Sequence, residues 1–284
     1  MCGRYAASQS SDELVEEFEV DADHTREIPR GLLKTPQRPP PGEPDYNLAP
    51  TKQARVVLTR APKEVAGQDV EAMVPEPLRQ LRLLTWGLVP SWSKDTAGAV
   101  RMINARVESV FDKPAYRRAT AARRCLVPAS GWYEWQASPV TTDAKGAPLK
   151  QPFYITRADG GSIAFAGIYE FWRDDTVEPH DPAAWLTTFA IITQAAEPGL
   201  DRIHDRQPLV LDRDRWAAWL DPRRTERTDL EPLVAPSLPG RFHAHPVARA
   251  VGGNRVNGPQ LLRPLARAEL RGVVDPMTGE VING

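Results

Sequence analysis

Residues 125–136 read Cys-Leu-Val-Pro-Ala-Ser-Gly-Trp-Tyr-Glu-Trp-Gln. The apolar first half is typical of a strand in a hydrophobic core. In the second half Glu134 stands between Tyr133 and Trp135. If Glu134 points inward with the apolar residues, loss of water raises the pKa of its carboxyl group. If it points outward, it is an ordinary solvated glutamate of a strand.

Around this stretch the sequence predicts a mostly β protein of the α+β class. Further strands are expected at residues 55–59, 80–89, 153–156, 163–171, 188–193 and 243–247. Ser10 and Glu13 match a capping box, which with Leu14 and Phe18 predicts a short helix over residues 11–18.

The chain contains neither an internal repeat nor a Ser/Gly linker, so we expect one compact domain over residues 2–264. Segments rich in proline or polar residues predict insertions at about 22–45, 61–78, 172–184 and 223–240. Residues 265–284 are expected to form a loosely held tail.

The chain begins Met1-Cys2-Gly3-Arg4, and removal of Met1 would leave an amine and a thiol on adjacent carbons. An α-amino group titrates near about 7.7–8.0 and a thiol near about 8.5, so both have a nucleophilic fraction at neutral pH. The pair suits a carbonyl, which gives an imine that the thiol can close to a thiazolidine, or an acyl group, which gives a thioester. On its position alone Cys2 would be an ordinary mobile terminal residue, and only partners elsewhere give it a chemical role.

Three other residues of the motifs each allow a structural and a functional interpretation. Asn104 and Arg106 lie in an apolar run, so Asn104 is either a hydrogen-bonded core residue or a positioned site group. His204 is followed by an acidic and a basic residue; a solitary histidine is more often structural, but this one suits proton transfer. Trp92 either packs in a turn or offers a ring on which a base can stack.

The two cysteines, Cys2 and Cys125, provide neither a disulfide framework nor a zinc motif. His243 and His245 would share a strand face but lack a third ligand, so we expect no metal and no cofactor. We expect a cytosolic protein, because the chain shows neither a membrane-length apolar stretch nor a secretory signal.

The net charge of −1 argues against a generally basic nucleic-acid binder, but it does not exclude a local basic patch. Arginines gather near the motifs, and their planar guanidinium groups suit phosphate.

Taken together, several motifs resemble the SOS response-associated peptidase (SRAP) family and follow that family's order from Cys2 to about residue 261. They are Met-Cys-Gly-Arg, Tyr-Asn-Leu-Ala-Pro, Trp-Gly-Leu-Val-Pro-Ser-Trp, Ile-Asn-Ala-Arg-Val-Glu, Ser-Gly-Trp-Tyr-Glu-Trp, Ile-His-Asp-Arg-Gln-Pro-Leu-Val and His-Pro-Val. The resemblance implies a β-barrel-like core with short flanking helices. It also implies action on abasic sites in single-stranded DNA, by a monomer that is nucleoid-associated when bound to DNA.

The resemblance also implies a role for each matching residue. Cys2 would capture the ring-opened deoxyribose as a thiazolidine crosslink, with Asn104 orienting its amine. Glu134 would act as acid and base, and His204 would assist proton transfer at the sugar. The DNA contacts would come from Arg4 and Arg106 at phosphates and from Trp92 at a base.

Two alternatives remain open from the sequence. The family name implies an autoproteolytic cysteine peptidase, in which Cys2 and a base release the preceding residue. Alternatively, the chain is a noncatalytic relative that binds single-stranded DNA, although the presence of Cys2, Asn104, Glu134 and His204 argues against this.

Overall fold

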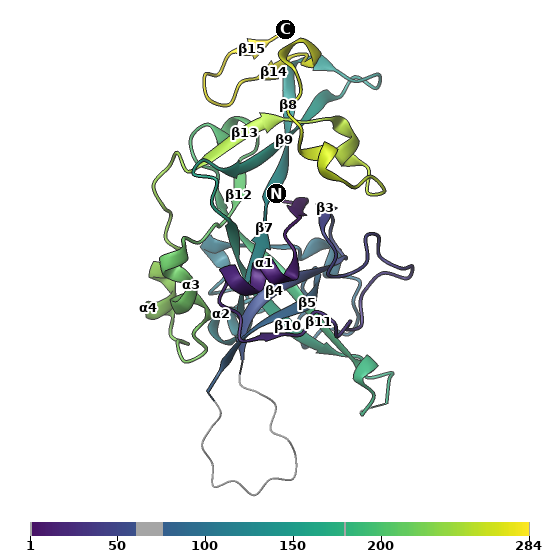
Figure 1. Ribbon diagram of the computed structural model, residues 1–284, viewed down its shortest axis with the longest axis vertical. Helices are drawn as coiled ribbons and strands as arrows, with labels where there is room; N and C mark the ends of the chain where they lie inside the picture. The colour runs from purple at the N-terminus through teal and green to yellow at the C-terminus, as the bar shows by residue number, and fades with distance from the viewer. Residues whose placement is uncertain (1, 61–75, 179, 284) are drawn as a thin grey trace, which may run out of the picture.

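The computed structural model describes residues 2–60, 76–178 and 180–283. The predicted insertion at 61–78 therefore lies for the most part outside the described residues. Within the described ranges the core is shared by a larger and a smaller sheet, with short helices against the larger one (Figure 1).

The larger sheet closes on itself as a barrel. Its barrel strands are β4 (Gln53–Arg60), β5 (Leu78–Trp86), β7 (Arg124–Ala129), β10 (Ile163–Arg173) and β11 (Trp185–Ala195). They follow the order β11-β10-β7-β4-β5, and β5 then pairs in parallel with β11 through Thr85↔Thr188 and Trp86↔Phe189. The structure thus confirms the mostly β fold with a barrel core.

Side-chain alternation divides these strands between the inside and the outside of the barrel. The inside holds one buried cluster that includes Val56, Leu58, Leu84, Val127, Phe165, Phe189 and Ile191. Gly167 belongs to this inner face, where an added Cβ would lie 2.8 Å from the Cys125 sulfur. A residue larger than glycine would therefore crowd the barrel interior.

Helices cover some of the outside of the barrel. The predicted helix is present as α1 (Ser11–Glu17), with its capping box at Ser10 and Glu13. Phe18 at its end stacks on Trp216 of α3 (Arg213–Leu220), with ring centroids 4.4 Å apart. This contact buries aromatic surface over the outer faces of β4, β7, β10 and β11.

The second sheet has the order β13-β9-β8-β1-β3. Its strands are β13 (Phe242–Pro246), β9 (Pro148–Arg157), β8 (Gly131–Thr142), β1 (Tyr5–Ala7) and β3 (Asp45–Leu48). The stretch 125–136 spans two strands, because β7 ends at Ala129 and β8 begins at Gly131. This change of sheet joins the barrel to the strand that carries Glu134.

The remaining elements are short. They are β2 (Ala22–Asp23), β6 (Asn104–Arg106), β12 (Arg206–Pro208), α2 (Arg117–Ala122), α4 (Arg227–Leu230), and 3-10 helices at Ala99–Arg101, Val107–Ser109, Pro182–Ala184, Leu200–Arg202, Glu231–Val234, Arg249–Gly252, Pro259–Leu262 and Arg267–Glu269. Among the residues described, helices long and apolar enough to cross a membrane are absent.

The prediction of a loosely held tail was wrong. Residues 265–284 include a hairpin of β14 (Val273–Val274) and β15 (Val281–Ile282) at the upper end of Figure 1. Leu270, Val273 and Ile282 are buried in the same cluster that fills the barrel. The pattern was missed because two-residue strands are too short to show alternation.

Gln136 of β8 holds this hairpin in place. Its Nε2 donates hydrogen bonds to the Arg202 and Val274 carbonyl oxygens at 3.0 and 2.9 Å, and its Oε1 accepts from the Val274 N–H at 2.8 Å. Because Gln136 is only 2% exposed, water cannot easily replace these bonds.

Replacement of Gln136 by leucine should therefore lower the free energy of unfolding by about 3 kcal/mol, since it leaves buried backbone groups without partners. Urea denaturation would measure this. Gln260→Leu, at an exposed position, is the matched control and should stay within about 0.5 kcal/mol of wild type. Equal stability of the two variants would show that the hairpin does not depend on Gln136.

Candidate active site

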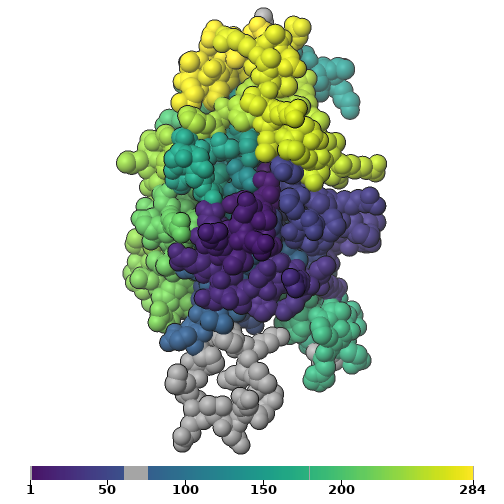
Figure 2. Space-filling view, in the orientation of Figure 1, coloured from purple at the N-terminus to yellow at the C-terminus, as the bar shows by residue number. Residues whose placement is uncertain are grey.

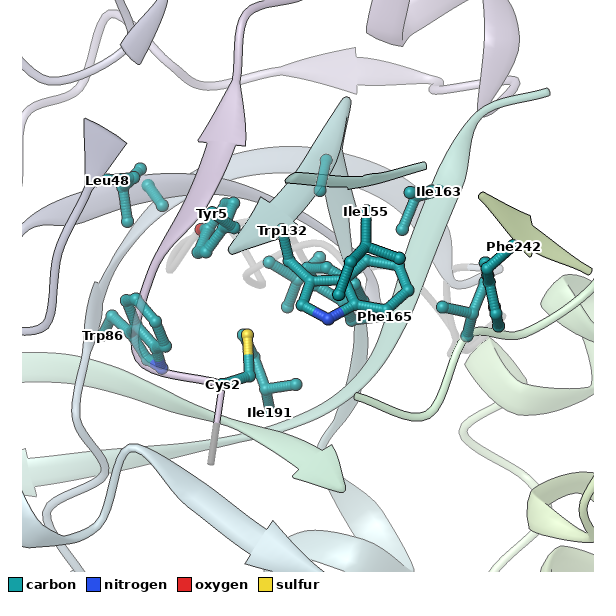
Figure 3. Close-up of a cluster of buried hydrophobic side chains, with 14 of the residues drawn as sticks. Cys2, Tyr5, Leu48, Trp86, Trp132, Ile155, Ile163, Phe165, Ile191 and Phe242 are labelled. Atoms are coloured by element: carbon teal, nitrogen blue, oxygen red, sulfur yellow. The ribbon is translucent and has the colours of Figure 1, made fainter. Parts of the chain in front are cut away.

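The amino-terminal segment enters one mouth of the barrel. We call this the Cys2 mouth, defined by Cys2 together with Trp86 at the end of β5 and Ile191 of β11. Figure 3 shows Cys2 beside Ile191, with Trp86 on one side and Trp132 and Phe165 on the other. In the space-filling view the N-terminal segment (purple) lies in the middle of the face shown (Figure 2).

Cys2 itself is fully buried. Burial raises the pKa of its thiol, and the nearby Glu134 carboxylate raises it further. Its Sγ lies 3.9 Å from the carbonyl oxygen of Arg4, which can accept the S–H. The group is therefore a thiol and not a thiolate at neutral pH.

Asn104 touches Cys2 directly. It lies on β6, which pairs in parallel with β11 through Asn104↔Ile191. The preceding residue, Ile103, is held in place by the Trp86 indole N–H, which donates a hydrogen bond to the Ile103 carbonyl oxygen at 2.9 Å. The Asn104 Nδ2 donates to the Cys2 carbonyl oxygen at 2.8 Å. Its Oδ1 is buried and accepts no hydrogen bond from the residues that the structure describes. A spare buried acceptor thus stands beside the first residues of the chain.

Glu134 points inward. It shares a face of β8 with Trp132 and is 3% exposed. The Tyr133 N–H donates to the Arg4 carbonyl at 2.9 Å, so the antiparallel pairing of β1 and β8 continues toward Gly3 and brings Glu134 alongside it. Burial raises the pKa of Glu134 to about 8. The carboxyl group is therefore mostly protonated at neutral pH and can donate a proton.

His204 follows the 3-10 helix at Leu200–Arg202, which Gln136 holds through the Arg202 carbonyl. Its Nδ1 accepts the Arg206 N–H at 3.0 Å and lies 2.8 Å from Asp205 Oδ1. Burial lowers the pKa of His204, which favours the neutral ring. β12, which follows, pairs with the end of β11 at the Cys2 mouth.

The three predicted DNA contacts differ in their settings. Trp92 is 67% exposed and Arg106 is exposed, so both are open to a ligand. Arg4 is partly buried, and its Nη1 donates to Asn47 Oδ1 at 2.8 Å and to the Val251 carbonyl at 3.3 Å. Arg4 is thus held by the protein itself, whereas the other two are solvent-facing.

Sequence reasoning missed two supporting residues of this site. Gln136 lies two residues after Glu134 on the same strand face, and that alternation could have found it. Arg206 donates to both carboxylate oxygens of Glu108 at 2.6 and 2.9 Å and to the Thr193 carbonyl at 2.8 Å. A pairing between residues so far apart in sequence leaves no local signal.

The chain is similar to several known proteins. It is 30% identical over 262 residues to the abasic site processing protein YoaM of Bacillus subtilis, covering 92% of this chain and 97% of that protein. It is 31% identical over 268 residues to the abasic site processing protein YedK of Escherichia coli, covering 93% and 100%. A crystal structure of a Bacteroides thetaiotaomicron protein has the same fold, with a TM-score of 0.69 at 21% identity and coverage of 93% and 100%.

The family model named SOS response associated peptidase (SRAP) matches residues 1–254, which include all the site residues above. This chain therefore belongs to the SRAP family.

Proposed function

We propose that this protein processes abasic sites by capturing the ring-opened sugar covalently at Cys2 in single-stranded DNA. The observation that carries the proposal is the convergence of Cys2, Asn104 and a Glu134 carboxyl of pKa about 8 at one mouth of the barrel. The names of the relatives, which are abasic site processing proteins, support it.

The first step opens the sugar. An abasic deoxyribose is a cyclic hemiacetal, and its aldehyde appears when the bond between C1′ and the ring oxygen breaks. The protonated Glu134 donates a proton to the departing ring oxygen, while the C1′ hydroxyl loses its proton. The neutral His204 ring is a suitable acceptor for that proton.

The second step joins the sugar to Cys2 after Met1 has been removed. Because burial keeps the thiol protonated, the amine attacks C1′ first, and loss of one water gives an imine. The thiol sulfur then adds to the imine carbon, and the thiol proton moves to nitrogen, which closes the thiazolidine. The free Oδ1 of Asn104 can accept an N–H of the attacking amine and so orient its lone pair.

The DNA is held by solvent-facing groups. Arg106 can bind a flanking phosphate, and Trp92 can stack on a base. Arg4, which its hydrogen bond to Asn47 holds in place, can form part of the entrance to the Cys2 mouth. Single-stranded DNA suits the site because extrusion of the sugar does not break pairing with a second strand. Affinity that rests on arginine and phosphate should weaken with salt.

Cys2→Ala should abolish the heat-stable adduct while noncovalent binding of single-stranded DNA remains, because the DNA contacts lie on other residues. Intact mass after incubation with an oligonucleotide carrying one abasic site measures the adduct, which should raise the mass of the protein by that of the oligonucleotide less one water. Borohydride should still trap an imine in the variant, because its amine is retained.

Cys125→Ala is the matched control, since Cys125 is the other cysteine and is buried in the barrel. It should crosslink as the wild type does. A heat-stable adduct in Cys2→Ala would contradict thiazolidine formation at this residue.

The pH dependence should report on Glu134. Because its acid form is the active one, the crosslinking rate should fall about tenfold per pH unit above about 8, after a rise at lower pH as the amine loses its proton. Glu134→Gln should react about 100-fold more slowly and lose the falling limb. Single-turnover rates from pH 5 to 10 measure both effects.

Glu170→Gln provides the control, because Glu170 is also a buried glutamate but pairs with Arg123 at 2.7 Å. Its crosslinking profile should match that of the wild type. A falling limb that persists in Glu134→Gln would remove this carboxyl group from the proton transfer.

A further inference from the structure

The barrel has a second mouth at the end away from Cys2. β4 ends there at Arg60, β10 ends there after Phe171, and β11 begins there at Trp185. A cavity of about 650 Å³ opens at this end, lined among others by Arg30, Arg60, Arg82, Tyr169, Phe171 and Trp185. We call it the arginine mouth. It lies toward the lower end of Figure 1, where β10 and β11 meet their connecting hairpin.

The arginine mouth carries unbalanced positive charge. The Arg60 guanidinium carbon lies 4.9 Å from the centre of the Phe171 ring, and among the described residues no carboxylate pairs with it. Arg82 faces Glu27 at 3.7 Å, a glutamate whose side chain is 67% exposed. Burial is the main cause that lowers the pKa of Arg82; the Glu27 carboxylate raises it, and the repulsion by Arg60, a smaller effect than that of Glu27, lowers it again. An anion between them would relieve that repulsion.

The other arginine of the cavity is already neutralised. Arg30 donates to Asp174 at 2.7 Å and to the Ala183 carbonyl at 3.0 Å. The charge available to a ligand therefore comes first from Arg60 on β4. Arg82 on the neighbouring strand β5 is shared with Glu27, and its Nε donates to Gln80 Oε1 at 2.6 Å, so its Nη atoms can add a second contact to the ligand.

Aromatic groups complete the cavity. Trp185 is 46% exposed, and Tyr169 meets Phe171 edge to face with ring centroids 5.7 Å apart. Burial raises the pKa of Tyr169 to about 12, so its hydroxyl stays protonated at neutral pH and can donate a hydrogen bond to a ligand.

We propose that the arginine mouth binds a nucleotide, with its phosphate between Arg60 and Arg82 and its base against the aromatic side chains. Guanidinium groups and a hydroxyl donor suit a phosphate, and aromatic faces suit a base of any sequence. The cavity volume matches that of small-ligand sites, about 300–1,000 Å³. The nucleotide is either a free mononucleotide or the 5′-phosphorylated end of a strand.

Calorimetric titration of the full chain tests this site. Deoxyadenosine monophosphate should bind saturably and at least about tenfold more tightly than adenosine or inorganic phosphate, because each of these has only one of the two recognised groups. A 5′-phosphorylated oligonucleotide that binds more tightly than its unphosphorylated form assigns the mouth to a strand end. Binding of the mononucleotide alone assigns it to free nucleotide.

Arg60→Gln should weaken nucleotide binding at least tenfold, and Trp185→Ala, at a more exposed position, should weaken it without risk to the core. Arg227→Gln is the matched control, because Arg227 also lies over a phenylalanine ring, Phe111, at 5.3 Å, but elsewhere on the surface. It should bind nucleotide as the wild type does. Thermal unfolding confirms that each variant is folded.

The site is separable from Cys2. Arg60→Gln should crosslink abasic DNA at the wild-type rate, and Cys2→Ala should bind nucleotide normally. Failure of both phosphorylated ligands to bind, or equal binding by wild type and by folded Arg60→Gln and Trp185→Ala, would overturn the proposal.

Discussion

Closure of the barrel is the constraint on which the rest of the structure depends. Strands β5 and β11 pair in parallel at Thr85↔Thr188 and Trp86↔Phe189, and this contact turns an open sheet into a closed one. Closure leaves no free edge at that point and gives the barrel two ends with different linings. At one end aromatic walls bury the start of the chain, and at the other arginines face a cavity.

The burial at the Cys2 mouth sets the chemistry of the candidate site. A carboxyl and a thiol that are both kept from water hold their protons, so in the proposed mechanism the site provides an acid at neutral pH and leaves the first attack to the amine. Exposed surface would give the opposite arrangement, an ionised glutamate and a more acidic thiol. The same enclosure suits the orienting role that we propose for Asn104, because water does not compete for its buried oxygen.

Much of this could be predicted from residues alone, and the reasons are local. The capping box predicts α1, and apolar strands such as β10 and β11 can be recognised by their composition. The aromatic neighbours of Glu134 marked it as a candidate buried acid, but only the structure shows that it points inward. The resemblance implied a barrel-like core, but the pair of strands that closes it could not be predicted, since a parallel pairing of strands about a hundred residues apart has no local pattern. The hairpin β14–β15 was missed for a similar reason, as its strands are two residues long and its partner Gln136 is distant.

The placement of β1 between β3 and β8 has a consequence for biosynthesis. Its partner β8 begins at Gly131, and the core is completed only by Ile282 near the end of the chain. While the ribosome is still making these later segments, the first residues can pair with β3 but lack β8 and the rest of the core that encloses Cys2. The order of translation thus leaves time for an aminopeptidase to act before folding encloses the chain end, which is the step that the proposed mechanism requires to create a free amine.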